Sequence, residues 1–209
     1  MSFSLNEMEA TAKRATRGAG YSWGQAEEAS KAARWLCAQG MDGAGALARL
    51  LTLGLASDLA AHRPRQVDGP WQGDGDLCPL SAGPLLSDCA HLLKTGPVEL
   101  QAVVSPALLL PFAANAARVL KSCISIEIDG VRAVTDGDHL AAPDILPITA
   151  RRVTVSQGVA PDVPRNRHTR AQPTLDDWAV LNRFAHRTYA PATEESRLLG
   201  AGAGLSDND

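Results

Sequence analysis

The residues near the carboxyl end of the chain are the first candidates for binding a small molecule. Five of them carry polar or ionisable side chains with no obvious role in a hydrophobic core: His186, Arg187, Tyr189, Ser196 and Arg197. A helix predicted just before them would present the first of these at its carboxyl end. We predict that a ligand site, if the chain has one, includes this segment. The alternative is the polar end of a helix and its solvated exit.

A basic cluster precedes that helix and could form an electropositive wall of the same site. It contains Arg165, Arg167, His168 and Arg170, with Arg151 and Arg152 upstream. Guanidinium groups hold carboxylates and phosphates through paired hydrogen bonds. We therefore expect Arg167 and Arg170 to contact a small carboxylate or phosphate, and the alternative is a solvated loop. No aromatic residue is interleaved with these arginines to stack on a base, so nucleic acid is not an expected partner.

Two further groups of residues have suitable chemistry but the wrong spacing for a metal ion or a nucleophile. Asp136, Asp138 and His139 lack the third acidic position and the later bidentate Glu of a calcium loop, so we expect a hydrated turn. Cys78 and Cys89 do not have zinc-ligand spacing, and we expect buried thiols there. The sequence thus predicts no metal and no cofactor, and it leaves the catalytic residues unknown.

Composition restricts the class of protein. The chain has 209 residues, a formal net charge of -3, 45% hydrophobic residues and four cysteines. It is too apolar for a disordered chain and too poor in cysteine for a disulfide scaffold. The first residues lack the basic and apolar regions of a signal peptide, and the longest apolar run is too short for a membrane span. We expect a cytoplasmic protein that contacts neither a membrane nor nucleic acid.

The first third of the chain has the periodicity of helices. Ser4 with Glu7 forms a capping-box pattern, Ser22 begins a second one, and Asp42 can cap a third helix. Small apolar residues, mainly Ala, follow at helical spacing and would let the helices approach closely. Residues 1–62 are therefore predicted to form a helical module.

The rest of the chain mixes strands and helices. Alternating apolar residues on either side of Asp129-Gly130 predict a two-residue β-hairpin, because both turn residues must reach positive φ. In chain order, we further predict a loop or linker at 63–84, a short helix at about 84–93, a buried strand at 98–104, a helix at 111–120, a strand at 153–155, a loop at 157–173 and a final helix from 174. That last helix is expected to bury Leu175, Trp178, Leu181 and Ala185.

These elements predict an α+β fold, in which an N-terminal helical module lies beside a small mixed or antiparallel sheet with flanking helices. The α+β region is expected at 85–190, ending in the carboxyl-terminal helix, and residues 191–209 are expected to be a flexible tail. A chain of this length can form one structural domain, which is what we expect.

The helical module also carries a resemblance to a family of enzymes. The stretch from Ala19-Gly20 to Gly40-Met-Asp-Gly-Ala-Gly45 resembles the N-terminal helical segment of the type-2 malate/L-lactate dehydrogenases, over residues 5–50. The Ser and His of that family's motif correspond here to Gly43 and Ala44. The resemblance therefore implies that the substrate-binding and catalytic chemistry of that His is missing.

A second resemblance covers more of the chain. It rests on Ser4-Leu-Asn-Glu-Met-Glu9, on Gly20-Tyr-Ser-Trp-Gly-Gln-Ala-Glu-Glu-Ala29 and on Ser196-Arg-Leu-Leu-Gly-Ala-Gly-Ala-Gly204. These segments resemble an uncharacterised bacterial family described only as a domain of unknown function. That resemblance implies no activity.

We expect a non-catalytic protein that binds a small anionic metabolite or a partner subunit and that forms a homo-oligomer. The missing His and the lack of a complete catalytic constellation in the sequence motivate this expectation. The alternative is an enzyme acting on a small molecule. It would be either a degenerate malate/lactate dehydrogenase or an enzyme with His186 or His139 as acid and base and arginines holding a carboxylate.

Overall fold

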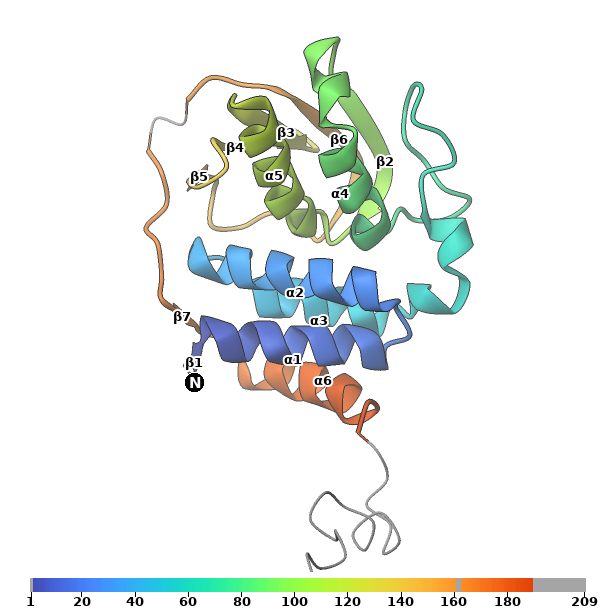
Figure 1. Ribbon diagram of the computed structural model, residues 1–209, viewed down its shortest axis with the longest axis vertical. Helices are drawn as coiled ribbons and strands as arrows, with labels where there is room; N and C mark the ends of the chain where they lie inside the picture. Colours follow the sequence, from blue (N-terminus) through green and yellow to red (C-terminus); the bar gives the residue numbers. More distant parts are fainter. Residues whose placement is uncertain (1, 161–162, 190–209) are drawn as a thin grey trace, which may run out of the picture.

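The computed structural model describes residues 2–160 and 163–189, and their elements form two layers (Figure 1). The helical layer consists of α1 (Leu5–Gly18), α2 (Trp23–Ala38), α3 (Gly43–Thr52) and α6 (Leu175–His186). The sheet layer consists of β2 (Val98–Val104), β3 (Ile124–Ile128), β4 (Val131–Thr135), β5 (Leu140–Ala141) and β6 (Thr149–Gln157), with α4 (Pro79–Asp88) and α5 (Leu110–Leu120) on one face. Short 3-10 helices are η1 (Leu55–His62), η2 (Ala90–Lys94) and η3 (Pro106–Leu109). The predicted α+β class is confirmed.

The helices of the first third begin at the capping residues that the sequence predicts. The Ser4 hydroxyl accepts a hydrogen bond from the Glu7 amide at 3.1 Å. Ser22 begins α2 with a complete capping box, and the Asp42 carboxylate accepts from the Gly45 amide at 2.8 Å. Each cap satisfies amides that have no partner inside the helix, so the helix starts are fixed locally.

Close approach of the helices depends on small residues at two contacts. A Cβ atom at Gly43 would lie 2.3 Å from the Ala33 carbonyl oxygen, so α3 begins directly against α2. A Cβ atom at Gly18 would lie 1.8 Å from the carbonyl oxygen of Phe184, so α1 ends directly against α6. Larger side chains at either position would push these helices apart.

The sheet is antiparallel, with strand order β2-β6-β3-β4-β5. The predicted hairpin is confirmed: β3 and β4 pair across Asp129 and Gly130, whose φ angles are +45° and +87°. The strand predicted at 153–155 is the middle of the longer β6. The sheet therefore buries the alternating isoleucines of β3 against α5, as the period-two pattern requires.

Much of the segment 63–84 lies along the outer edge of β2. The Trp71 amide donates to the Glu99 carbonyl oxygen and the Leu77 amide to the Ala102 carbonyl oxygen, each at 2.7 Å. Both Trp71 and Leu77 are buried. The segment thus covers strand groups that would otherwise stay unpaired at an exposed edge.

The helix predicted at 84–93 is wrong in its position. Helix α4 begins at Pro79 and ends at Asp88, and η2 follows it. Pro79 occupies the start, where a missing amide costs nothing, so Pro84 falls inside the helix and does not begin it. The helix predicted at 111–120 is confirmed as α5, with a proline in its first turn.

The chain returns to the helical layer after β6. The segment 163–170, here called the strap, leads to β7 (Arg170–Ala171), which pairs with β1 (Phe3–Ser4) at the start of the chain. Helix α6 then packs on α1 and α3, although the sequence grouped it with the sheet region. The predicted tail, 191–209, lies outside the described residues.

Helix α6 buries only part of its predicted stripe. Leu181 and Ala185 are buried, and Trp178 is half-buried with its ring stacked on Phe3 at a centroid distance of 3.9 Å. The prediction that Leu175 is buried is wrong, because its side chain is 64% exposed. Leu175 is the first residue of α6, where the helix has not yet reached the contact with α1.

Among the described residues, no single helix combines the length and the apolar character needed to cross a membrane. The adjacent helices α3 and η1 reach that length and composition only together, and they meet at 90°.

Candidate functional site

The structure separates the predicted site residues into two groups at opposite ends of α1. The Arg170 guanidinium lies at the start of the chain, where it donates to the Ser2 hydroxyl at 2.6 Å and to the Ser2 carbonyl oxygen at 2.9 Å. Arg187 lies at the other end, because its Cβ would be 3.4 Å from a Cβ atom added at Gly18. Helix α1 has 14 residues, about 20 Å, between the two groups.

Of the residues predicted near the carboxyl end of the chain, two lie beside Arg187 and two lie outside the described residues. His186 and Tyr189 are with Arg187, and their rings meet edge to face at 5.2 Å. Ser196 and Arg197 lie outside the described residues. The strap and the end of α6 therefore do not form the walls of one shared site.

Arg165 of the strap has a structural role. Its guanidinium donates to the carbonyl oxygens of Gln39 at 3.0 Å, Gly40 at 3.1 Å and Ala142 at 3.0 Å, and it contacts the Asp144 carboxylate at 2.9 Å. Its side chain is 17% exposed. Carbonyls at a helix C-terminus lack partners within the helix and attract positive charge. Arg165 thus fastens the strap to the end of α2.

Arg167 of the strap faces a pocket between the two layers. This α2–α5 pocket has a volume of about 300 Å³. Its charged and amide lining residues are Glu28, Lys31, Arg34, Asn115, Arg118 and Arg167, and its apolar lining residues are Leu5, Ala32, Trp35, Ala38, Pro111 and Phe112. The pocket thus combines cationic groups from three segments with an apolar wall, which is the usual composition of a small-ligand site.

The wall from α2 carries two cations that are paired with carboxylates. The Lys31 ammonium lies 3.5 Å from a Glu28 carboxylate oxygen and 3.6 Å from one of Glu27, and the Arg34 guanidinium lies 3.2 Å from Glu9. The Lys13 ammonium hydrogen-bonds Glu27 and, as the largest cause, holds the pKa of that carboxyl below its usual range. These pairs are solvent-exposed, and such pairs are weak enough for an anionic ligand to exchange with them.

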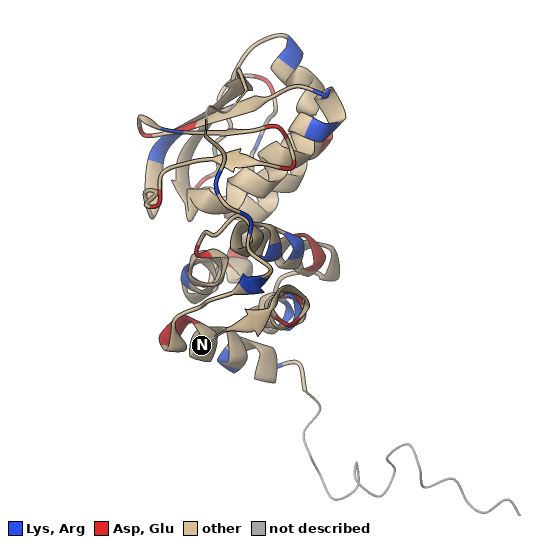
Figure 2. Ribbon diagram, turned by 90° about the vertical axis from the view of Figure 1, so that its left-hand side faces the viewer, with Lys and Arg blue, Asp and Glu red and all other residues tan. Residues whose placement is uncertain are grey.

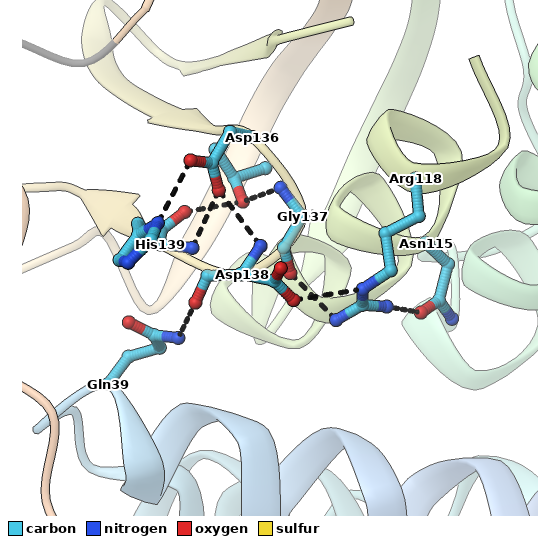
Figure 3. Close-up of polar contacts among 8 residues, drawn as sticks. Gln39, Asn115, Arg118, Asp136, Gly137, Asp138 and His139 are labelled. Carbon is cyan, nitrogen blue, oxygen red and sulfur yellow. Dashed lines mark hydrogen bonds and ion pairs between the residues drawn. The ribbon is translucent and has the colours of Figure 1, made fainter. Parts of the chain in front are cut away.

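The wall from α5 carries Arg118, which also holds a turn of the sheet layer (Figure 3). Its guanidinium donates to the Asn115 side-chain oxygen at 2.6 Å and to the Gly137 carbonyl oxygen at 2.7 Å. It lies 3.5 Å from the Asp138 carboxylate. Gln39 of the helical layer donates to the Asp138 carbonyl oxygen at 2.8 Å, so this turn touches both layers.

The turn at Asp136–His139 satisfies its own polar groups (Figure 3). One Asp136 carboxylate oxygen accepts from the amides of Asp138 at 2.9 Å and His139 at 2.7 Å, and the other lies 2.9 Å from the His139 ring nitrogen Nδ1. Partial burial raises the pKa of Asp136, but these hydrogen bonds outweigh it and lower the pKa overall. His139 is oriented by a carboxylate, yet it is not a lining residue of the α2–α5 pocket.

Cys78 is fully buried, as the sequence predicts. Its sulfur lies 3.6 Å from the Tyr21 hydroxyl, and burial raises the pKa of both groups. The prediction of a buried thiol is wrong for Cys89, which is only half-buried. In residues 2–160 and 163–189 no group of three or more His, Cys, Asp or Glu side chains could hold a metal ion.

Two positions of the dehydrogenase-like motif, Gly43 and Ala44, are buried. Gly43 has no space for a side chain against Ala33, and Ala44 is 1% exposed. A Ser at position 43 would have to displace α2, whereas Ala44 lines a pocket of about 380 Å³ together with His168 and Arg170. Gly40, Asp42 and Gly45 are explained by the turn between α2 and α3 and by the Asp42 cap. Local structure accounts for these three residues, so they are not evidence for the dehydrogenase resemblance.

Comparison with known families agrees with the second resemblance. Residues 3–82 match the family described as protein of unknown function (DUF3726). The match to DUF3726 spans α1 to α3 and the start of α4, so it includes the α2 wall of the pocket and excludes α5 and the strap. No curated protein matches the chain.

Sequence reasoning identified Arg167 but missed the rest of the cationic pocket. Lys31 and Arg34 are one helical turn apart on α2, and that spacing was available as a signal. Arg118 gave no such signal, because α5 reaches the pocket only through packing of the two layers.

Proposed function

We propose that this protein binds a small anionic metabolite, a carboxylate or phosphate, in the α2–α5 pocket and does not transform it. The observation that supports this most directly is the charge of the lining: Lys31, Arg34, Arg118 and Arg167 surround the space, and Glu28 is its one lining carboxylate. Three different segments supply these cations. Figure 2 shows the arginines of the strap, in blue, where it descends from the sheet layer to the helical layer.

Arg167 is the residue best suited to hold the anion. Among the described residues it makes no ion pair, whereas Lys31, Arg34 and Arg118 each lie near a carboxylate. An incoming anion therefore does not have to displace a partner to reach the Arg167 guanidinium, which can bind a carboxylate or phosphate through two hydrogen bonds. The ring of Trp35 and the ring of Pro111 offer an apolar surface to the body of the ligand.

Two observations support binding without catalysis. His139, the described histidine with a carboxylate partner, uses that carboxylate within its own turn and does not line the pocket. His186 lies at the far end of α1 from the strap. A general acid or base must come within hydrogen-bond reach of the reacting atoms, and neither histidine does so in this pocket.

We place this function in the cytoplasm. The four cysteines are free, and the two that are fully packed, Cys37 and Cys78, have pKa values raised chiefly by burial, to about 11 for Cys37. Such thiols stay protonated and unreactive at neutral pH. Free thiols are typical of a reducing compartment.

We also propose that the protein forms a homo-oligomer. Ile145 and Ile148 expose 85% and 64% of their side chains in the loop between β5 and β6. Exposed apolar side chains of this size are common at contacts between subunits. Light scattering of the purified chain measures its mass directly, and a monomer at high concentration would remove this part of the proposal.

The anion-binding proposal is tested by calorimetry with malate, lactate, inorganic phosphate and phenyl phosphate as separate probes. We expect at least one of them to bind and to raise the melting temperature. Arg167→Ala should weaken that binding about tenfold, the loss of one charge-assisted contact. Arg151→Ala is the matched control, because this exposed arginine lies in β6, away from the pocket lining. Binding by no probe, or equal weakening by both variants, would contradict the proposal.

A further inference from the structure

Three arginines at the ends of α1 and α6 lie over aromatic rings. The guanidinium carbon of Arg17 is 4.7 Å from the centre of the Trp23 ring. Arg14 lies 5.8 Å from the centre of the Tyr189 ring, and Arg187 lies 4.6 Å from that of Phe184. We call these six residues the arginine–aromatic surface.

The three pairs form one continuous surface. Arg14 and Arg17 are three residues apart on α1 and therefore lie on the same side of that helix. Arg187 lies against Gly18, the last residue of α1. In Figure 1 the carboxyl ends of α1 and α6 lie together at the same side of the helical layer, beside the start of α2.

The charge of this surface is not balanced within the described part of the chain. Arg14, Arg17 and Arg187 make no ion pair with a described carboxylate, whereas Lys13, Lys31 and Arg34, also on α1 and α2, all do. Arg17 donates to the Tyr21 carbonyl oxygen, which leaves its charge uncompensated. A concentration of positive charge thus exists on a protein whose net charge is -3.

Two of the three aromatic side chains of the surface, Trp23 and Tyr189, are exposed, and Phe184 is half-buried. The side chain of Trp23 is 64% exposed and that of Tyr189 is 51% exposed. Trp, Tyr and Arg are the residue types that contribute most to binding energy at protein interfaces. Their exposure costs the isolated protein free energy that a partner would recover on covering them.

From these observations we propose that the arginine–aromatic surface binds an acidic segment of a partner protein. The carboxylates of that segment would accept hydrogen bonds from the edges of Arg14, Arg17 and Arg187, and its backbone would cover Trp23. Nucleic acid fits less well, because one face of each ring is already covered by a guanidinium group and single-stranded binding depends on open ring faces. This proposal is independent of the α2–α5 pocket.

The experiment uses the full chain and a fluorescein-labelled peptide of eight glutamates, with binding followed by fluorescence anisotropy at low salt. We expect binding that weakens as salt increases. Arg14→Glu with Arg187→Glu should weaken it tenfold or more, and Trp23→Ala should weaken it several-fold without a change in charge. The matched control, Arg151→Glu with Lys121→Glu, makes the same change in net charge on the sheet layer, and it should retain binding within about twofold.

Three results would overturn the proposal. One is no binding of the glutamate peptide. Another is equal weakening by the surface and control variants, which would mean that only net charge matters. The third is tighter binding of a labelled oligothymidine of equal length, which would assign the surface to nucleic acid. Circular dichroism of each variant confirms that it is folded, and Arg14→Lys with Arg187→Lys provides a charge-conserving second test.

Discussion

The α2–α5 pocket and the arginine–aromatic surface use cations in opposite ways. In the pocket, Lys31 and Arg34 face carboxylates, and the apolar groups lie behind them in a recess of about 300 Å³. On the surface, Arg17 and its neighbours face aromatic rings that stay open to solvent. Exposed carboxylate partners bind a cation only weakly, so a small anion can displace them. Ring partners hold a guanidinium flat and leave its hydrogen-bonding edge free, which suits a larger acidic partner.

The largest effect is expected from a variant that loosens the strap, which carries Arg167 of the pocket, and leaves the arginine–aromatic surface intact. Arg165→Ala deletes the contacts that fasten the strap to α2 and leaves the carbonyl oxygens of Gln39 and Gly40 without their partner. We expect a loss of about 3 kcal/mol in the free energy of unfolding, because the hydrogen bonds are charge-assisted and the Arg165 side chain is only 17% exposed. Urea denaturation measures this loss.

The control for that variant is Arg167→Ala, two residues along the same strap. Arg167 is exposed, so its removal should change the unfolding free energy by less than about 0.5 kcal/mol. Binding of the glutamate peptide should survive in the Arg165 variant while it is folded. If both variants lost the same stability, Arg165 would not be the residue that fastens the strap.

The next test separates stability from binding on the surface. Trp23→Ala removes the ring beneath Arg17, and an exposed cation–π contact is worth about 0.5–1 kcal/mol. We expect the unfolding free energy to fall by no more than this, because Trp23 is 64% exposed. Thermal and urea denaturation provide the measurement. A loss of several kcal/mol in the free energy of unfolding would show that Trp23 is a core residue. The arginine–aromatic surface would then not differ from the pocket in the way described.

A smaller effect is expected when the pocket loses a competing carboxylate. Glu28→Gln removes the negative charge 3.5 Å from Lys31 and should strengthen binding of the pocket's anionic probe about threefold. Calorimetry with the best probe provides the affinity. Glu127→Gln, on the exposed side of β3, is the matched control and should leave the affinity unchanged. Weaker binding in the Glu28 variant would mean that this carboxylate holds the ligand.

The smallest expected effect is a change in the free energy of unfolding at low pH. The Lys13 ammonium depresses the pKa of Glu27 in the folded chain, so this ion pair contributes stability above the ordinary carboxyl pKa of 4.5 and loses it as the pH falls through the folded value. The stability advantage of wild type over Glu27→Gln should therefore shrink below about pH 4.5. Denaturation at a series of pH values tests this. The arginines of the surface keep their charge throughout, so acid should leave the positive charge of that surface unchanged.

The elements with local signals were predictable from the sequence. Ser4, Ser22 and Asp42 cap the helices that their spacing predicts, and Asp129-Gly130 makes the hairpin turn. Capping and hairpin formation depend on residues within a few positions of each other, so a single sequence contains the information. The start of α4 was missed because two prolines, at 79 and 84, compete for the same local role.

The candidate site could not be predicted in the same way. The sequence identified Arg167 and Arg187 by residue type and placed them in one site, whereas Arg167 lines a pocket with Leu5, the first residue of α1, and Arg187 lies against Gly18, its last. It also treated Arg165 as equivalent to its neighbours, although among the described arginines of the strap it is Arg165 whose side chain reaches the carbonyl oxygens of Gln39 and Gly40. Those outcomes depend on where the strap crosses the helical layer, which no residue of the strap determines by itself.

The sequence alone determined the helix starts, the hairpin, the α+β class and the absence of a motif His at position 44, which is Ala. Tertiary structure decided which cations meet a carboxylate, which meet an aromatic ring and which meet a helix end. The physical reason is the range of the interactions: caps and turns join neighbours along the chain, whereas the pocket joins α2 to α5 and the surface joins α1 to α6. Such long-range contacts exist only after the two layers have packed.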